Sequence, residues 1–249
     1  MRMRIKPSVI AIVAAAGLGT RLGAALPKAF VELRGRSLLE RSVSAMAQSG
    51  VVDAIYVVVS PEMEPLAARL LQGHDVTFIH GGAERADSVW NALQSIQLDD
   101  ATVLIHDAAR ALTPSAMIAR VAAAVEDGAQ AVIPVVPVAD TIKVVDNGFV
   151  ESTPDRSRLR AVQTPQGFDL HTLREANRAY FAASASGDGV DFVPTDDASL
   201  MEWFDIPVFT VQGDPMAFKI TTPIDLVLAQ RITDEAQPAV LGAPDNPGA

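Results

Sequence analysis

Cysteine is absent from the 249-residue sequence. Its absence excludes disulfides, thiolate metal sites and cysteine nucleophiles. Any metal bound by this chain must therefore take oxygen or imidazole ligands. A small number of oxygen ligands beside a phosphate group favours Mg²⁺ or a related hard cation.

Long apolar runs are also missing. The longest candidate, residues 9–16, is too short to cross a bilayer and leads directly into a glycine-rich turn. The basic residues at the N-terminus resemble the start of a signal peptide, but no small-residue cleavage site follows them. We therefore expect a cytoplasmic protein with no membrane partner.

Positive charge is scarce over most of the chain, whose 20 Lys and Arg against 30 Asp and Glu give a net charge of −10. This balance argues against nonspecific binding of nucleic acid, which depends on a positive surface that displaces counterions. Residues 1–41 are the exception, with eight Lys or Arg, two Glu and a net charge of +6. Such a basic segment in an acidic protein can focus a small polyanion into one cleft.

Apolar residues make up 49% of the chain and recur in short runs rich in β-branched side chains. Continuous apolar strands separated by helices indicate a mostly parallel sheet that is covered on both faces, an α/β doubly wound fold. We predict one domain over residues 1–233. The predicted strands are residues 9–14, 54–59, 76–79, 102–105, 131–136 and 208–211. The predicted helices are residues 38–49, 63–71, 86–96, 114–127, 170–183 and 222–232, and Ser37 and Asp169 are suitable N-caps.

Predicted strands and helices stop alternating at about residues 140–167. Short strand-like segments alternate there with turn residues such as Asn147-Gly148, which predicts a projecting β arm. An arm of this kind often packs on a second subunit. The last stretch, residues 234–249, is rich in Pro, Gly and Ala, and we expect a disordered tail.

A glycine-rich turn follows the first predicted strand. Gly17, Gly19 and Gly23 allow the backbone to approach a phosphate closely, and Arg21 and Lys28 flank the same turn. Two cations beside such a loop suit stabilisation of charge on a transferring phosphoryl group. The alternative is an ordinary strand-to-helix turn with two surface charges. The turn lacks the Gly-Lys-Ser/Thr ending of an ATPase P-loop, and its glycine spacing differs from that of a dinucleotide fingerprint.

A set of short motifs, in order along the chain, resembles one known family. They are AAGLGTR at 15–21, PK at 27–28, GGAERADSV at 81–89, HDAAR at 106–110, DTIK at 140–143, TPQ at 164–166 and TDDA at 195–198. Together they resemble the 2-C-methyl-D-erythritol 4-phosphate cytidylyltransferases. The resemblance extends from about residue 8 to residue 232 and implies a Rossmann-like nucleotidyltransferase fold.

The resemblance implies a CTP- and Mg²⁺-dependent enzyme of non-mevalonate isoprenoid synthesis that forms a homodimer through its β arms. Arg21 and Lys28 match the positions that stabilise the transition state. Asp107, at the end of an apolar strand, matches a contact to the metal and the nucleotide, and it could serve as an N-cap at the same time. The other matched nucleotide contacts are Ala15, Ala16, Gly17, Gly19, Gly82, Arg85 and Ser88.

The same matching implies a site for methylerythritol phosphate. Its residues are Arg110, Thr141, Arg156, Thr164, Thr195 and Lys219. Arg156 would reach this site from the partner's arm. From the residues alone, Arg156 would pass for a turn residue, and Lys219 for a pocket lysine or a surface lysine. His106, a lone His at a strand end, is interpreted as a packed core residue.

Three alternatives remain open at this point. Ribitol 5-phosphate cytidylyltransferases share the nucleotide motifs, so the acceptor depends on the arm and on Lys219. A nucleotide-binding regulator without catalysis is disfavoured because binding alone does not need every transition-state group. A dinucleotide oxidoreductase is disfavoured by the glycine spacing. Ala29 and Ala111 depart from the residues common in the family, but neither position carries the expected chemistry.

Overall fold

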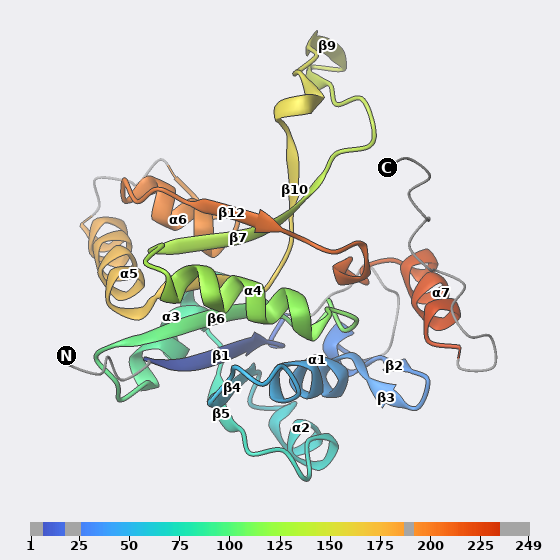
Figure 1. The fold of residues 1–249 in the computed structure, drawn as a ribbon, viewed down its shortest axis with the longest axis vertical. Helices are drawn as coiled ribbons and strands as arrows, with labels where there is room; N and C mark the ends of the chain where they lie inside the picture. Colours follow the sequence, from blue (N-terminus) through green and yellow to red (C-terminus); the bar gives the residue numbers. More distant parts are fainter. Residues whose placement is uncertain (1–6, 18–25, 187–191, 235–249) are drawn as a thin grey trace, which may run out of the picture.

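The computed structural model describes residues 7–17, 26–186 and 192–234, which form an α/β fold around one eight-stranded sheet (Figure 1). Along the sheet the order is β10-β7-β11-β6-β1-β4-β5. The eighth strand, β12, stands outside this order and pairs with β7. The strands are β1 (Ser8–Ala14), β4 (Ala54–Val59), β5 (Thr77–His80), β6 (Ala101–Asp107), β7 (Ala131–Pro137), β10 (Arg160–Val162), β11 (Gln166–Asp169) and β12 (Phe209–Gln212). Each predicted strand is confirmed to within about two residues, the usual uncertainty of element ends.

The sheet is mostly parallel, as the apolar runs predicted. β1 pairs parallel with β4 and β6, β4 with β5, and β12 with β7. Two strands that the pattern did not separate from the arm, β10 and β11, run antiparallel to their neighbours. β11 lies between β6 and β7, so the chain that returns from the arm enters the middle of the sheet.

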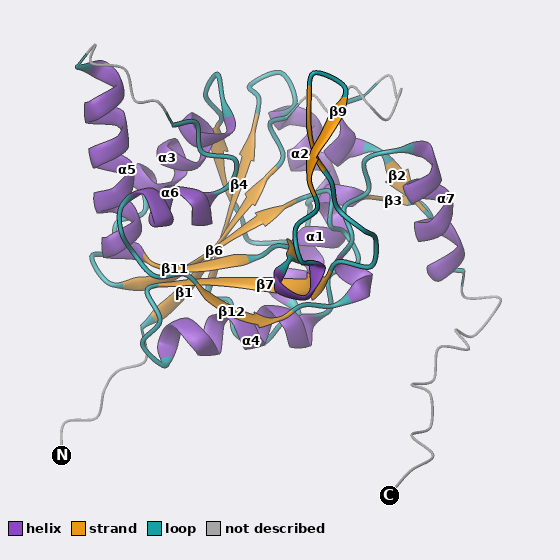
Figure 2. Cartoon of the chain, turned by 90° about the horizontal axis from the view of Figure 1, so that it is seen from above, coloured by secondary structure: helices purple, strands orange, loops and turns teal. Residues whose placement is uncertain are grey.

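Helices cover both faces of the sheet, which confirms the doubly wound fold (Figures 1 and 2). β1 shows why: Val9, Ala11 and Val13 pack with α1, α2 and α4, whereas Ile10 and Ile12 pack with α3, α5 and α6. A strand with apolar side chains on both faces can be buried only between two layers. These helices are α1 (Leu38–Ala47), α2 (Glu64–Leu70), α3 (Arg85–Ser95), α4 (Ser115–Glu126), α5 (Leu170–Ala185) and α6 (Asp197–Trp203).

The predicted helix caps are present. The Ser37 hydroxyl accepts a hydrogen bond from the Glu40 backbone N–H at 3.1 Å, and Asp169 accepts one from Thr172 at 2.8 Å. Each satisfies a backbone donor that the first turn leaves unpaired. The pattern missed α6, a short helix that begins after the cap residue Asp196. Its two turns are too short for a clear helical period.

The β arm projects from the sheet at the top of Figure 1, and Figure 2 shows it from above. Its tip is the hairpin of β8 (Val144–Asp146) and β9 (Phe149–Ser152). Asn147 and Gly148 have φ of 48° and 84°, as a tight type I′ turn requires. The first strand of the predicted arm begins at Val144. Phe149 is 79% exposed.

The last helix, α7 (Pro223–Ile232), lies beside the small hairpin of β2 (Glu32–Leu33) and β3 (Arg36–Ser37). Beyond Asp234 the expected tail lies outside the described residues. In the part of the chain that is described, no helix has the length and apolarity needed to cross a membrane.

Candidate functional site

A cavity of about 320 Å³ opens at the carboxyl ends of β1, β4 and β6. Ligands of open α/β sheets bind at this edge, because the loops that leave the strands meet there. The cavity is lined by Ala14, Ala15, Ala16, Gly17, Lys28, Ala29, Val58, Gly82, Ala83, Glu84, Arg85, Ser88, Asp107, Ala108, Ala109 and Lys219. Segments from both ends of the chain therefore build one site.

Glycines bring the backbone segments of this site close together. A Cβ atom on Gly81 would lie 2.7 Å from the Ala16 Cβ, and one on Gly82 would lie 2.2 Å from the Asp87 Cβ. Neither space admits a side chain. The Ser88 hydroxyl lies in the same turn, where it accepts from the Gly82 N–H and donates to the Glu84 carbonyl, both at 3.0 Å. Ser88 thus fixes the turn from which α3 begins.

Two cations of the cavity lie close to the carboxylate of Asp107. One carboxylate oxygen lies 2.7 Å from the Lys219 Nζ, and the other lies 3.8 Å from the Arg85 Nε. Burial by itself would raise the pKa of Asp107, but the charges of Lys219 and Arg85 outweigh it and lower the pKa to about 2. Asp107 is therefore ionised at neutral pH. It forms no N-cap bond that the structure shows.

Arg85 is held by a second carboxylate that sequence analysis did not single out. Its Nη2 lies 2.6 Å from the Oδ2 of Asp197, a residue whose side chain is 6% exposed. Burial would lower the pKa of Arg85, yet Asp197 and Asp107 together raise it, so this guanidinium remains charged. Burial raises the pKa of Asp197, although Arg85 opposes the shift. Asp197 stands in the quoted TDDA motif, which was the available signal.

The structure brings together most of the predicted nucleotide contacts. Those that line the cavity are Ala15, Ala16, Gly17, Lys28, Gly82, Arg85, Ser88 and Asp107, with Lys219 from the predicted acceptor site. Arg21 and Gly19 lie outside the described residues. Sequence analysis missed Glu84, which also lines the cavity.

Two of the remaining predicted residues, Arg110 and Thr164, do not line the cavity. The Arg110 guanidinium donates to the backbone carbonyls of Val162 and Ala217. The Thr164 hydroxyl accepts from the Asp107 N–H and bonds the His106 Nδ1, each at 3.1 Å. His106 is fully buried, as expected, and burial lowers its pKa to about 4.

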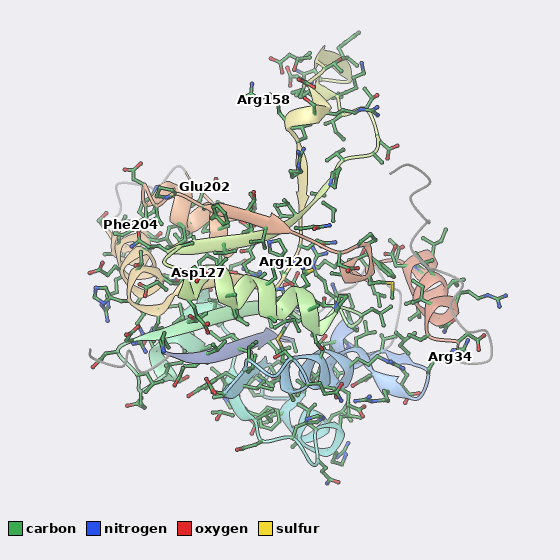
Figure 3. The ribbon with its side chains drawn as sticks, in the orientation of Figure 1. Arg34, Arg120, Asp127, Arg158, Glu202 and Phe204 are labelled. Carbon is green, nitrogen blue, oxygen red and sulfur yellow. The ribbon has the colours of Figure 1, made fainter. Side chains whose placement is uncertain are left out.

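The other predicted acceptor residues lie away from this cavity in the single chain. Arg156 begins a short 3-10 helix in the arm, η3 (Arg156–Arg158), and donates to the Ala139 carbonyl at 2.8 Å. Arg158, labelled in Figure 3, marks the position of this helix. Thr141 is exposed near the base of the arm. Thr195 precedes α6, where its N–H donates to the Ser199 hydroxyl.

The described residues of this cavity fit a metal ion that is shared with a bound phosphate group. Within residues 7–17, 26–186 and 192–234, no three His, Asp or Glu side chains are grouped so that they could hold a metal by themselves. Asp107 nevertheless presents an ionised carboxylate to the cavity. One carboxylate combined with phosphate oxygens is a usual environment of Mg²⁺, which keeps several waters and takes few protein ligands.

The fold and the cavity define an α/β enzyme that transfers a nucleotidyl group: glycines at the strand ends, the cations Lys28, Arg85 and Lys219, and the Asp107 carboxylate suit a triphosphate with its metal. The family model for 2-C-methyl-D-erythritol 4-phosphate cytidylyltransferase matches residues 9–235. A Corynebacterium efficiens protein of that name is 62% identical, with 95% of this chain and 97% of the relative covered. A Corynebacterium glutamicum protein of the same name is 60% identical, over 95% and 96%.

Solved structures agree with this match. The Thermus thermophilus 2-C-methyl-D-erythritol 4-phosphate cytidylyltransferase superposes with a TM-score of 0.73 at 36% identity, covering 92% of this chain and 98% of that one. The Anaerococcus prevotii 4-diphosphocytidyl-2C-methyl-D-erythritol synthase has a TM-score of 0.79 at 28% identity, covering 91% and 96%. The chain belongs to the family of 2-C-methyl-D-erythritol 4-phosphate cytidylyltransferases.

Proposed function

We propose that the cavity around Asp107 transfers CMP from CTP to 2-C-methyl-D-erythritol 4-phosphate, giving 4-diphosphocytidyl-2-C-methyl-D-erythritol and pyrophosphate. The observation that carries this assignment is the joining of Lys28, Arg85 and Lys219 with the glycine-lined strand ends in one cavity. A reaction with CTP as co-substrate and a place in non-mevalonate isoprenoid synthesis follow from family membership.

The nucleotide side of the site comprises the residues around β1 and α3. Ala16 and Gly17 would offer their backbone N–H groups to the triphosphate, and Gly19 would extend this loop. Ala15 would line the same site, since its own N–H donates to the Val58 carbonyl at 2.8 Å. Gly82 and Ser88 would help to hold the cytosine end of the nucleotide. Arg85 is kept charged by Asp197 and Asp107, so it is available to an anionic ligand.

The chemical step needs little more than positioning and charge stabilisation. An oxygen of the acceptor phosphate attacks the α-phosphorus of CTP, a new P–O bond forms, and the bond to the leaving pyrophosphate breaks with its electron pair. Negative charge gathers on the α-phosphoryl oxygens and on pyrophosphate. Arg21 and Lys28 are proposed to stabilise that charge, because a cation already in place needs no reorganisation during the reaction.

The acceptor side is proposed to be completed by a second subunit. Lys219 would meet the acceptor phosphate from within the chain, and Thr164 and Thr195 are proposed to belong to the same acceptor site. Thr141 and Arg156 lie in or near an arm that projects from its own subunit (Figure 1). A homodimer joined through these arms would bring Arg156 to the partner's cavity.

Mg²⁺ is proposed as the metal, held by Asp107 and by phosphate oxygens of CTP. When bound, it would neutralise part of the triphosphate charge. We further propose that residues 1–233 form one cytidylyltransferase domain that acts in the cytoplasm.

The alternative acceptor, ribitol 5-phosphate, is not favoured, because relatives about 60% identical over nearly the whole chain bear the methylerythritol phosphate name. Pyrophosphate release with CTP and Mg²⁺, measured with each acceptor in turn, tests the proposal. We expect strong preference for methylerythritol phosphate. Preference for ribitol phosphate would overturn the acceptor, and no release with either would overturn the enzymatic role.

A further inference from the structure

Helix α7 is apolar on two sides. One side packs into the chain's own core through Leu226 and Ala229. The other side presents Ile224, Val227 and Leu228, which are 75%, 56% and 51% exposed. Their spacing of three and four residues places them on one helical face, the α7 stripe. Because a helix that is apolar all round is normally buried, we expect the stripe to be covered by a partner.

The tip of the β arm also presents an apolar face to solvent. β8 and β9 form a two-stranded sheet of their own, and every residue of both strands is exposed. Val145 lies opposite Val150. Val144 lies opposite Ser152, two residues along β9 from Val150, so it shares their side of the hairpin, the valine face. An isolated two-stranded hairpin is marginally stable at best in water, so this tip is expected to pack on another surface.

The arm tip of a second copy fits the α7 stripe. Within one chain the arm tip and α7 stand apart (Figure 1), so contact between them takes two chains. Opposite charges border the two apolar faces, because the stripe continues at the exposed Arg231, whereas β8 and β9 carry Asp146 and Glu151. An apolar centre with complementary charges around it is typical of subunit interfaces. In a two-fold symmetric dimer the contact would form twice.

We propose that the α7 stripe docks the valine face of the partner's arm, which makes α7 part of the homodimer interface. The contact matters for the cavity because α7 begins at Pro223, shortly after Lys219. An arm seated on α7 is held beside the segment that supplies this lysine. The inference rests on the proposed homodimer for its second copy, but it does not depend on the identity of the substrates.

Disulfide trapping tests the contact directly, because the chain has no cysteine of its own. Full-length Val150→Cys and Val227→Cys chains with tags of different mass are co-expressed and oxidised. Two cysteines are bridged only when their Cα atoms lie within about 7 Å, so we expect a reducible product of mixed mass. In the control, Val193→Cys replaces Val227→Cys. Val193 is also largely exposed, but it precedes α6, which lies on the other side of the molecule from α7 (Figure 1), so no mixed product is expected.

Alkylation of the single-cysteine variants identifies what covers the stripe. Protein concentrations are chosen on both sides of the dimer dissociation constant, which sedimentation equilibrium provides. The rate at which a thiol reagent modifies Val227→Cys should fall at least about fivefold as the dimer forms, whereas Val193→Cys should react at a constant rate. Val227→Glu should raise the dissociation constant about tenfold or more, because it places a charge in an apolar contact, and Val193→Glu should leave it unchanged.

Three results would overturn the inference. A disulfide between two Val150→Cys chains in place of the mixed product would show that the arm tips pack on each other. Protection of Val227→Cys at every concentration would show that another part of the same chain covers the stripe. Rapid alkylation at every concentration would show that nothing covers it. Pyrophosphate release by the wild type is measured separately, so that failure of the proposed function is distinguished from failure of this contact.

Discussion

The ammonium group of Lys219 lies 2.7 Å from the carboxylate of Asp107. The cation proposed to meet the acceptor phosphate and the carboxylate proposed to hold the metal are thus paired with each other before any ligand binds. A metal ion at Asp107 would compete with Lys219 for the same oxygen. Substrate loading is therefore expected to separate this pair.

Replacement of Asp107 by Asn should weaken the binding of Mg²⁺. The amide keeps the size of the side chain but loses the charge that attracts both the metal and Lys219. We expect kcat/KM for CTP to fall at least about tenfold and the Mg²⁺ concentration for half-maximal activity to rise. Titration of activity with Mg²⁺ at fixed CTP measures both. An unchanged titration would remove Asp107 from the metal site.

Lys28→Ala and Arg21→Ala should each lower kcat by about 10²-fold or more, because each removes a positive charge proposed to act on the transferring phosphoryl group. Steady-state kinetics with both substrates saturating measures this loss. Arg69→Ala, on the distant helix α2, is a suitable control and should retain full activity. A near-normal kcat in either variant would mean that the glycine loop does not hold the reacting phosphate.

Gly17→Ala should impair nucleotide binding without loss of stability. Among the described residues, no atom lies within 4 Å of the Cβ that this change would add, so we expect no clash with them. The same methyl group would enter the space proposed for the triphosphate. We expect KM for CTP to rise about tenfold while the unfolding midpoint stays unchanged.

Gly167→Ala should instead lower stability without impairing nucleotide binding. Its added Cβ would lie 2.7 Å from the Val121 Cγ1 in the core, away from the cavity. We expect a loss of about 1–3 kcal/mol in the free energy of unfolding, with KM for CTP unchanged. Denaturant unfolding and kinetics on both variants separate the two effects. If Gly17→Ala kept normal CTP binding, the triphosphate could not lie against this turn.

His106 should make the protein less stable in acid. Its folded-state pKa is about 4, whereas the unfolded imidazole keeps its ordinary pKa of about 6.5, so the unfolded state takes up the proton first as the pH falls. Stability is therefore lost between about pH 6.5 and 4, by about 3 kcal/mol in total. His106→Asn can still bond Thr164 but does not titrate. Its stability curve should be flatter over this range, and identical slopes in both proteins would contradict the assignment.

Mixed dimers test whether the arm serves the partner's cavity. Arg156→Ala alone should raise KM for the acceptor. A Lys28→Ala subunit and an Arg156→Ala subunit should together recover about one quarter to one half of wild-type activity, because one of the two sites then carries both intact residues. Activity after mixing and reassembly measures this. Failure to complement would indicate an arm that serves its own subunit.

Local chemistry made much of the molecule predictable. The β-branched runs predicted the strands that build the sheet, and Ser37 and Asp169 predicted the starts of two helices. These features depend on neighbours within four residues, so the sequence carries them directly. By contrast, β11 and α6 were missed because each is short and takes its form from the segments packed around it.

The sequence by itself determined the family, the glycine-lined turn and most of the residues that line the cavity, because these lie in motifs that remain contiguous when folded. Only the tertiary structure decided the pairings of Lys219 with Asp107 and of Arg85 with Asp197, the latter 112 residues apart. It also showed that the Arg110 guanidinium donates to the carbonyls of both Val162 and Ala217. Such contacts depend on the order of strands in the sheet, which hydrophobic periodicity does not encode.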